Sequence, residues 1–252
     1  MRTIEGENEL LLTCAETPDG AAILRCETRD DAVRLPDEIG GAPVVSLGAY
    51  ALSERAPDLA GRETFPVRVT CGGPEPVHDA NAIRAVTLPR GLQSVGGHAF
   101  YNCRRLERLT LTGSVRDFGG DTLMNCRALR HIRLHADPAA PTCLHRVLGE
   151  HAGELDVMFL HGGARIRLLF PAYSEELETL APAHIFQRRI HGAGYGYRQC
   201  FESGVLHFRG YDLALESLLD RHDFSVAARV AVRRLAAPYQ LADAARAAYL
   251  DC

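Results

Sequence analysis

The stretch VTLPRGLQSVGGHAFYNCRRL, residues 86–106, is followed at a step of 23 residues by a second copy, LTLTGSVRDFGGDTLMNCRAL, residues 109–129. A third, partial copy continues the series, so that leucines recur at Leu88, Leu111 and Leu134. The other positions that recur at this step are Gly96 and Gly119, Asn102 and Asn125, Cys103 and Cys126, and Leu106 and Leu129. A fixed period of this length predicts a protein in which successive copies stack on one another.

The spacing of apolar residues within one copy predicts a short strand followed by a tight return. Leu109 and Leu111 alternate with polar residues, which is typical of a strand with one buried face. Gly119 allows the chain to turn sharply, and Ala99 and Phe100 are expected on a short helical return. One copy cannot bury its own apolar face, so we expect the copies to share one continuous core.

An earlier and looser copy opens the repeat region. Residues 33–36, Val-Arg-Leu-Pro, match the strand, and residues 47–52 match the part of the later copies that begins at Val95. A degenerate stretch, residues 53–81, separates this copy from the clear ones and contains an expected strand at Val67–Thr70.

These copies resemble the BspA-like leucine-rich repeat family. Units of that family read as a strand, Leu-Pro, Ile-Gly, Ala-Phe, and a Cys three residues before the Leu that leads into the next strand. The matching residues here are Leu88-Pro89, Val95-Gly96, Ala99-Phe100 and Asn102-Cys103 ahead of Leu106. The resemblance is specific over about 81–136 and looser over 32–55, and it departs at Thr112 and at Thr122-Leu123. It implies a parallel-stranded solenoid that contacts proteins, and it brings no catalytic residues.

The residues before the repeats predict a β-hairpin. Two apolar runs, residues 9–14 and 21–26, flank the turn Thr17-Pro18-Asp19-Gly20. Pro-Asp-Gly strongly favours a turn between two strands. We therefore expect residues 1–31 to form a hairpin that caps the solenoid, whose repeats span residues 32–142.

A second hairpin is predicted after the repeats, because apolar runs within residues 155–171 flank Gly162-Gly163. Residues Glu175–Leu180 are expected to form a short helix that Pro182 ends. An irregular, glycine-rich block follows at residues 190–201. Residues 143–209 are thus interpreted as a β-hairpin and a Gly-rich connector.

Residues 210–252 have helical character. Leu215, Leu218 and Leu219 share one face of a predicted helix. Asp223 or Ser225 can cap a second helix.

Arg233 and Arg234 would complement the dipole at the end of that second helix. Pro238 ends it, and a third helix is expected from about Leu241. This helix has no stop signal before Cys252, so we expect an incomplete module, or a terminal helix that docks against a partner.

Composition limits the function. The chain has 252 residues, 46% hydrophobic and 24% charged, with a net charge of −4, as in an ordinary globular protein of the α/β class predicted by the repeats. No basic field would attract nucleic acid, and no apolar run would span a membrane. All 28 basic residues are Arg, which removes lysine-dependent chemistry. No signal peptide is visible, so we expect a cytoplasmic protein with its eight cysteines reduced.

Three patterns that could carry chemistry favour structural explanations. Cys103 and Cys126 stand in repeat register, where a cysteine is usually buried. His131 and His135 are four apart, but the register places them on a strand and its exit, not on a helix. The glycines of residues 192–196 lack the strand and spacing of a phosphate loop. We predict no catalytic residues, no metal site and no cofactor.

Outward positions on the strands are the candidate binding residues, because strands line the concave face of a solenoid. They are Arg108 and Thr110 in one copy and His131, Arg133 and His135 in the next. Residues 101–136 carry seven Arg against three acids, which suggests a basic strip for an acidic partner. Tyr195, Tyr197 and Arg198 are a second candidate, either as an exposed anchor for a partner or as packing between the hairpin and the helices.

The sequence therefore predicts a non-enzymatic scaffold for protein–protein interaction, with the partner unidentified. Two alternatives remain open. One is a recruiting or regulatory arm of a larger complex. The other is an enzyme with a site in the Gly-rich connector.

Overall fold

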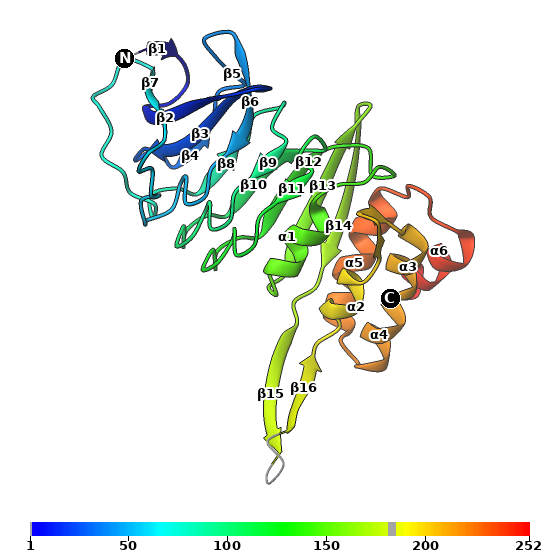
Figure 1. Ribbon diagram of the computed structural model, residues 1–252. Helices are drawn as coiled ribbons and strands as arrows, with labels where there is room; N and C mark the ends of the chain where they lie inside the picture. The colour runs from blue at the N-terminus through cyan, green and yellow to red at the C-terminus, as the bar shows by residue number, and fades with distance from the viewer. Residues whose placement is uncertain (1, 181–184) are drawn as a thin grey trace.

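The computed structural model describes residues 2–180 and 185–252. Its main feature is a six-stranded sheet in the order β14-β13-β12-β10-β8-β4, in which five neighbouring strands run parallel (Figure 1). The five parallel strands are β4 (Ala32–Arg34), β8 (Ala85–Thr87), β10 (Arg108–Thr112), β12 (His131–His135) and β13 (Leu155–His161). Strand β14 (Ala164–Phe170) closes the sheet as the antiparallel partner of β13.

A second sheet lies behind the first and contains the other short strand of each repeat copy. Strands β6 (Ala42–Leu47), β9 (Ser94–Val95) and β11 (Asp117–Phe118) pair in parallel in that order. The first three copies thus each contribute one strand to each sheet, and the chain coils around the core between them. The predicted stacking of copies is confirmed.

The core between the sheets consists of the repeated leucines. Leu88, Leu111 and Leu134 are buried, as are Leu106 and Leu129. The register steps by one repeat from strand to strand, since Leu111 pairs with Leu134 across β10 and β12. The side chains that recur at 23 residues therefore lie above one another and exclude water together.

The returns between the two sheets are series of turns and not the short helices expected from the sequence. His98, Asn102, Asp121 and Asn125 have positive φ angles of 55° to 65°, which a helix cannot accommodate. The backbone hydrogen bonds run between neighbouring coils and not along one coil, for example from Phe100 N to Thr122 O at 3.0 Å. Stacking thus replaces the hydrogen bonds that a helix would make internally.

Asparagine and cysteine side chains reinforce these returns. Asn125 Nδ2 donates to Asn102 Oδ1 at 2.8 Å, and Cys126 Sγ donates to the carbonyl oxygen of Phe100 at 3.1 Å. Cys103 Sγ donates to the carbonyl oxygen of Leu52 in the preceding coil at 3.3 Å. Both residue types therefore recur at positions where the side chain bonds to the neighbouring coil.

The N-terminal hairpin is present as β2 (Leu10–Thr17) and β3 (Gly20–Glu27), and β3 pairs in parallel with β6 of the first repeat copy. The strand of the degenerate stretch is β7 (Phe65–Thr70). It pairs with β2 and with β1 (Arg2–Glu5), not with the repeat strands. A two-residue strand, β5 (Glu38–Ile39), pairs with β6.

Residues 53–81 thus leave the repeat stack and return to it. The repeat strands on either side, β4 and β8, are direct neighbours, with Val33 opposite Val86. The looser first copy is confirmed by this register, although 53–81 does not form a coil of its own between them.

The predicted hairpin after the repeats is confirmed as β13 and β14. Its first strand also continues the repeat sheet, since β13 runs parallel to β12, and α1 (Leu144–Glu150) forms the return that precedes it. The helix expected at Glu175–Leu180 is wrong. Ser174–Leu180 is strand β15, which pairs along its whole length with β16 (Ile185–His191); Pro182 lies outside the described residues.

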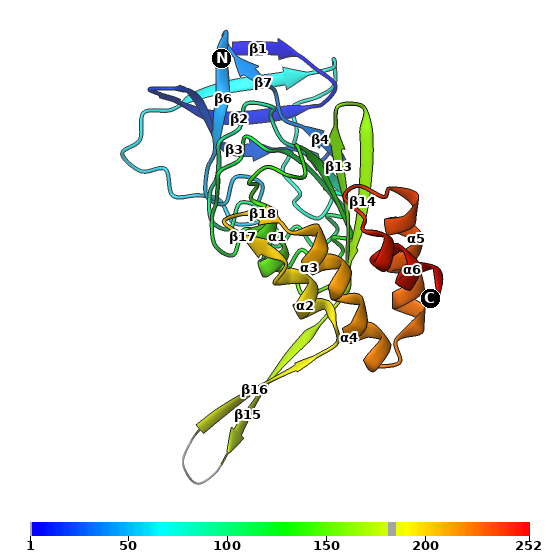
Figure 2. The same ribbon diagram turned by 90° about the vertical axis from the view of Figure 1, so that its right-hand side faces the viewer.

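Strands β15 and β16 form an arm that projects from the body of the molecule, as both views show (Figures 1 and 2). Beyond the arm, the chain forms α2 (Gly194–Arg198) and the small hairpin of β17 (Phe201–Glu202) and β18 (Val205–Leu206). The Gly-rich connector is therefore largely regular.

The C-terminal region is helical, as expected. It consists of α3 (Phe208–Leu213), α4 (Leu215–Asp220), α5 (Phe224–Ala236) and α6 (Asp243–Leu250), and α5 packs against β14. Asp223 caps α5 by accepting a hydrogen bond from Val226 N at 3.4 Å. The buried side chains of α4 and α5, including Leu215, Leu218 and Val230, join the core of the sheets.

Arg233 and Arg234 bond to backbone carbonyls near the end of α5, as the dipole argument expects, but their main partners are carboxylates elsewhere. Arg234 is fully buried and donates to both oxygens of Asp212 at 2.7 and 3.0 Å. Arg233 donates to Asp156 on β13 at 2.8 Å. These two arginines therefore attach α5 to α3 and to the repeat sheet.

Candidate functional site

The candidate site is the outer face of the six-stranded sheet, which we call the groove face. Residues on β10 and β12 alternate strictly between buried and solvent-facing. Arg108 and Thr110 on β10 face outward, and so do His131, Arg133 and His135 on β12. The structure therefore brings the five residues predicted from the repeat register onto one surface.

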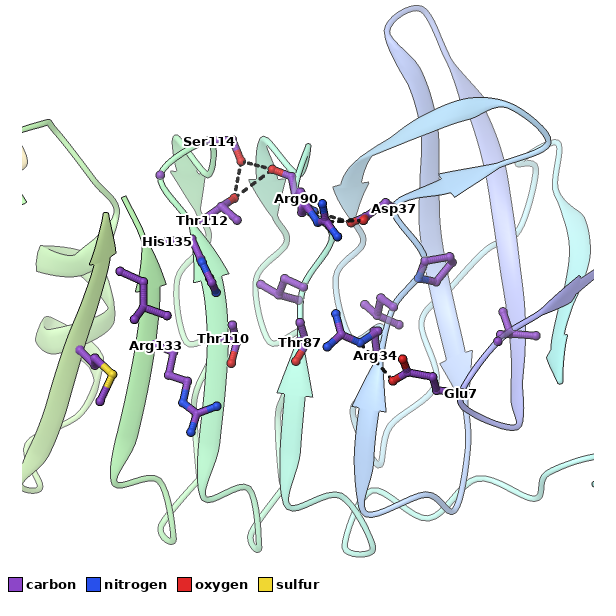
Figure 3. Close-up of a pocket in the computed structure, with 18 of the residues that line it drawn as sticks. Glu7, Arg34, Asp37, Thr87, Arg90, Thr110, Thr112, Ser114, Arg133 and His135 are labelled. Carbon is purple, nitrogen blue, oxygen red and sulfur yellow. Dashed lines mark hydrogen bonds and ion pairs between the residues drawn. The ribbon is translucent and has the colours of Figure 1, made fainter. Parts of the chain in front are cut away.

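A groove of about 1210 Å³ runs along this face, and Figure 3 shows its lining. Its charged and imidazole side chains are Arg34, Arg90, Arg116, Arg133, Arg165 and His135, against the acids Glu5, Glu7 and Asp37. Thr110, Arg133 and His135 line the groove, whereas Arg108 and His131 lie on the same face outside it. The groove therefore carries a local excess of positive charge, in contrast to the chain as a whole.

Some of this charge is already neutralised and some is not. Arg34 is ion-paired with Glu7 at 3.3 Å, and Arg90 with Asp37 at 3.2 Å. Within residues 2–180 and 185–252, neither Arg133 nor Arg165 is ion-paired. These two guanidinium groups are available to an anionic ligand.

The register aligns polar side chains in a row across four strands. Arg34 on β4 is opposite Thr87 on β8, Thr87 is opposite Thr110 on β10, and Thr110 is opposite Arg133 on β12. Figure 3 shows the row with both arginines at its ends and the two hydroxyl groups between them.

The wall of the groove beyond β4 is the segment between β1 and β2. Asn8 is buried there, and its side chain donates to the carbonyl oxygen of Ala32 at 2.7 Å and accepts from Arg34 N at 2.8 Å. Asn8 thus forms hydrogen bonds with backbone groups on the free edge of β4, where a further strand would otherwise pair. This contact also holds Glu7 beside Arg34.

Sequence reasoning missed Arg34, Thr87 and Glu7 as site residues. Arg34 and Thr87 could have been found from the sequence. The alignment of residues 33–36 with the later strands places both at the same outward position as Thr110 and Arg133. Glu7 carries no such signal, since it lies outside the repeats and reaches the groove only through the pairing of distant segments.

The prediction that Tyr195, Tyr197 and Arg198 form an exposed anchor is wrong. Tyr197 is fully buried and packs edge-on against Tyr211. Arg198 is buried as well, and every hydrogen bond that its guanidinium makes within the described part of the chain goes to a backbone carbonyl group. Tyr195 is half-buried at the base of the arm, under the guanidinium of Arg188. The alternative interpretation, packing between hairpin and helices, describes these residues.

A smaller pocket of about 570 Å³ lies at the base of the arm, next to the Gly-rich connector. Two of its charged residues, Glu175 and Arg188, are ion-paired with each other, which raises the pKa of Arg188. A third, Arg198, is bound to carbonyl groups. The charges at this pocket therefore bind one another and the backbone.

The repeat cysteines are buried thiols. Burial raises the pKa of Cys126 to about 12, and that of Cys103 is raised well above the usual range. A reactive thiolate needs the opposite setting, with a lowered pKa and access to solvent. Among the described residues, no group of three or more His, Cys, Asp or Glu side chains is placed to hold a metal ion. No helix in the same part of the chain is both long and apolar enough to cross a membrane.

The stack of parallel strands at a 23-residue step defines a leucine-rich repeat protein. The sequence model of the family described as "BspA type Leucine rich repeat region (6 copies)" matches residues 77–139. Residues 77–139 are therefore similar to the repeats of that family.

Two solved structures are similar to parts of the chain. One is a leucine rich cell surface protein from Faecalibacterium prausnitzii, with 17% identity and a TM-score of 0.32, covering 56% of this chain and 31% of that one. The other is a leucine rich repeat protein of T. pallidum, with 24% identity and a TM-score of 0.26, covering 49% of this chain and 68% of that one. The chain thus spans under a third of the first protein's length. No curated protein is significantly similar to it.

Proposed function

We propose that this protein is a non-enzymatic interaction scaffold that binds an acidic segment of a partner protein on the groove face. The observation that carries the proposal is the outward face of β12. Its three solvent-facing side chains are His131, Arg133 and His135, and among the described residues none of the three is ion-paired.

Electrostatics supports an acidic ligand. Five arginines line the groove against three acids, while the whole chain carries a net charge of −4. A cleft with an excess of one sign of charge concentrates ligands of the opposite sign and accelerates their association. The preference for acidic ligands is therefore a property of this face and not of the whole surface.

A selection of displayed random peptides on the immobilised protein tests this function. We expect acidic sequences to be enriched on the wild-type protein and to be lost on the double variant Arg108→Glu, Arg133→Glu. The matched control is Arg104→Glu, Arg105→Glu, which makes the same change in charge at exposed turn positions that lie on none of the strands of the groove face. Equal enrichment on both double variants would contradict the proposal.

The arm favours a second candidate, a recruiting component of a larger complex. Seven residue pairs join β15 to β16, and Leu177 is 70% exposed. A two-stranded hairpin by itself has only marginal stability in water. An exposed apolar side chain on it can be buried by a partner protein. If so, Leu177→Glu should leave the unfolding temperature unchanged and should remove the protein from high-mass fractions of a native extract.

We also propose a cytoplasmic location, supported by eight free cysteines. Six of them are buried, and only Cys71 and Cys252 are exposed. Thiol labelling of protein taken directly from the native cell should modify two residues before unfolding and eight after it. Protein recovered with disulfide bonds would contradict this location.

A further inference from the structure

We propose, resting on the binding function of the groove face, that the partner segment is an extended strand lying across β4, β8, β10 and β12. It carries two acidic side chains four residues apart, one placed on Arg133 and the other on Arg34. The inference specifies three properties of the ligand: it is extended, it lies across the strands of the sheet, and its two acidic residues are four positions apart.

The spacing follows from the register. Arg34 and Arg133 are the two ends of the row described above, on strands that are three intervals apart. Neighbouring strands are about 4.8 Å apart, so the two backbone positions are separated by about 14 Å. An extended chain advances about 3.4 Å per residue, so its residues i and i+4 lie about 13.5 Å apart and point to the same side. The two distances match.

A helical ligand does not fit this pair of arginines. On a helix, side chains at i and i+4 are only about 6 Å apart. Two acids at that spacing would both lie near Arg133 and its histidine neighbours and would leave Arg34 unbound. A dependence on the extended spacing is therefore specific to the proposed binding mode.

The middle of the row supplies the contacts for residue i+2 of the ligand. Thr87 and Thr110 are half-buried, and within the described residues neither hydroxyl makes a hydrogen bond to another side chain or to the backbone. A hydroxyl both donates and accepts, so a small polar residue between the two acids is accommodated. The full pattern expected of the ligand is acidic, any, polar, any, acidic.

Glu7 shows that a carboxylate binds at one end of the row. Its Oε2 lies 3.3 Å from Arg34 Nε, with side chains 78% and 57% exposed. Asn8, held on the edge of β4, keeps Glu7 at this position. Glu7 therefore occupies the place of the ligand's second carboxylate, and the partner must displace it. The chain's own N-terminal segment thus weakens binding at Arg34.

Synthetic nine-residue peptides in a serine background test the spacing. The first carries glutamates at positions 3 and 7, and the second, of equal charge, carries them at positions 3 and 4. Fluorescence anisotropy at low salt should show the first peptide bound about twofold more tightly, because the gain from an exposed ion pair, up to about 1 kcal/mol, is partly offset by the displacement of Glu7.

Two variants of exposed side chains then identify the arginine and its competitor. Arg34→Gln should remove the difference between the two peptides without changing the affinity of the second. Glu7→Gln should strengthen binding of the first peptide severalfold. Unchanged unfolding temperatures would show that both variants remain folded.

The outcomes separate this inference from the function on which it rests. Equal affinity for the two peptides, with binding abolished by Arg108→Glu, Arg133→Glu, would overturn the extended strand and retain the acidic ligand. No binding of either peptide, together with no acidic enrichment in the display selection, would overturn both. Tighter binding of an oligogalacturonate than of any peptide would overturn the assignment to a protein segment.

Discussion

Arg198 and Arg234 are buried side chains that hold separate parts of the chain together. Arg198 lies where the arm, α1 and the connector meet, and burial lowers its pKa to about 10. Its guanidinium donates to the carbonyl groups of Leu148, His151, Gly153, Pro171 and Gly194. Arg234 forms the equivalent junction among the C-terminal helices through Asp212, which also accepts from Tyr249 Oη at 2.9 Å.

Replacement of Arg234 should be the most damaging change in the helical region. Arg234→Met preserves most of the volume but leaves Asp212 buried without its cation, and removing one partner of a buried pair costs about 3–5 kcal/mol. Urea unfolding followed by circular dichroism measures the loss. Arg229→Met is the control, because its partner Glu154 is partly exposed, and it should cost less than about 1 kcal/mol. Equal losses would mean that burial of the pair is unimportant.

Some residue environments could be predicted from the sequence and others could not. Arg133 could be predicted as exposed because the strand period of two alone determines the direction of its side chain. Arg198 could not be predicted as buried. Its partners come from segments up to 50 positions away, and no local pattern indicates that carbonyl groups will converge on it.

At the scale of elements, the coils are kept in contact by glycines at their corners. A Cβ atom on Gly119 would lie 2.4 Å from the backbone nitrogen of Gly97 in the coil before it. The adjacent Gly120 has no atom within 4 Å of the same position. The repeated glycine of the sequence is thus explained by close approach between coils.

Gly119→Ala should therefore destabilise the protein, because the two coils must separate to admit the methyl group. We expect a loss of about 1–3 kcal/mol, typical of overpacking, measured by thermal or urea unfolding. Gly120→Ala is a matched control at the next residue and should change stability by less than about 0.5 kcal/mol. A larger loss at Gly120 than at Gly119 would contradict this account of the coil contact.

The arm should contribute little to the stability of the rest of the protein. Replacing residues 178–187 by an Asn-Gly turn, which suits a tight hairpin, retains the pairing at its base. We expect a change below about 0.5 kcal/mol in the free energy of unfolding, since the arm projects from the body of the molecule (Figures 1 and 2). A marked loss would show that the removed part is needed for folding.

At the scale of the whole molecule, acid should weaken the junction between the repeats and the C-terminal region. His151 is buried there, and burial, together with the charges of Arg130 and Arg198, lowers its pKa to about 4. Its Nε2 atom has no hydrogen-bond partner among the described residues. The unfolded chain binds a proton on this residue near pH 6.5, and the folded chain only near pH 4.

The contribution of neutral His151 to the free energy of unfolding is therefore fully present above about pH 6.5 and is lost as the pH falls towards 4. The loss is at most about 3 kcal/mol. Glu150, whose pKa is raised by burial, acts in the opposite sense, so the comparison must be made between variants. His151→Gln should unfold with a smaller difference in free energy between pH 7.5 and 5 than the wild-type protein. An identical pH dependence would show that His151 is not responsible.

The repeat architecture and the outward face of β10 and β12 could be predicted from the amino-acid sequence alone. Both depend on period, and a period is a local property that appears in the order of residues. The 23-residue step sets which leucines share the core, and the alternation of strand residues sets which arginines face solvent.

Three features become visible only in the folded chain. They are the wall of the groove, the burial of Arg198 and the pairing of residues 65–70 with the N-terminal hairpin. Each of these depends on contacts between segments far apart in sequence, where hydrogen-bond partners and not periodicity select the arrangement. Glu7 is the clearest case, because it becomes part of the groove face only when Asn8 bonds to the edge of β4.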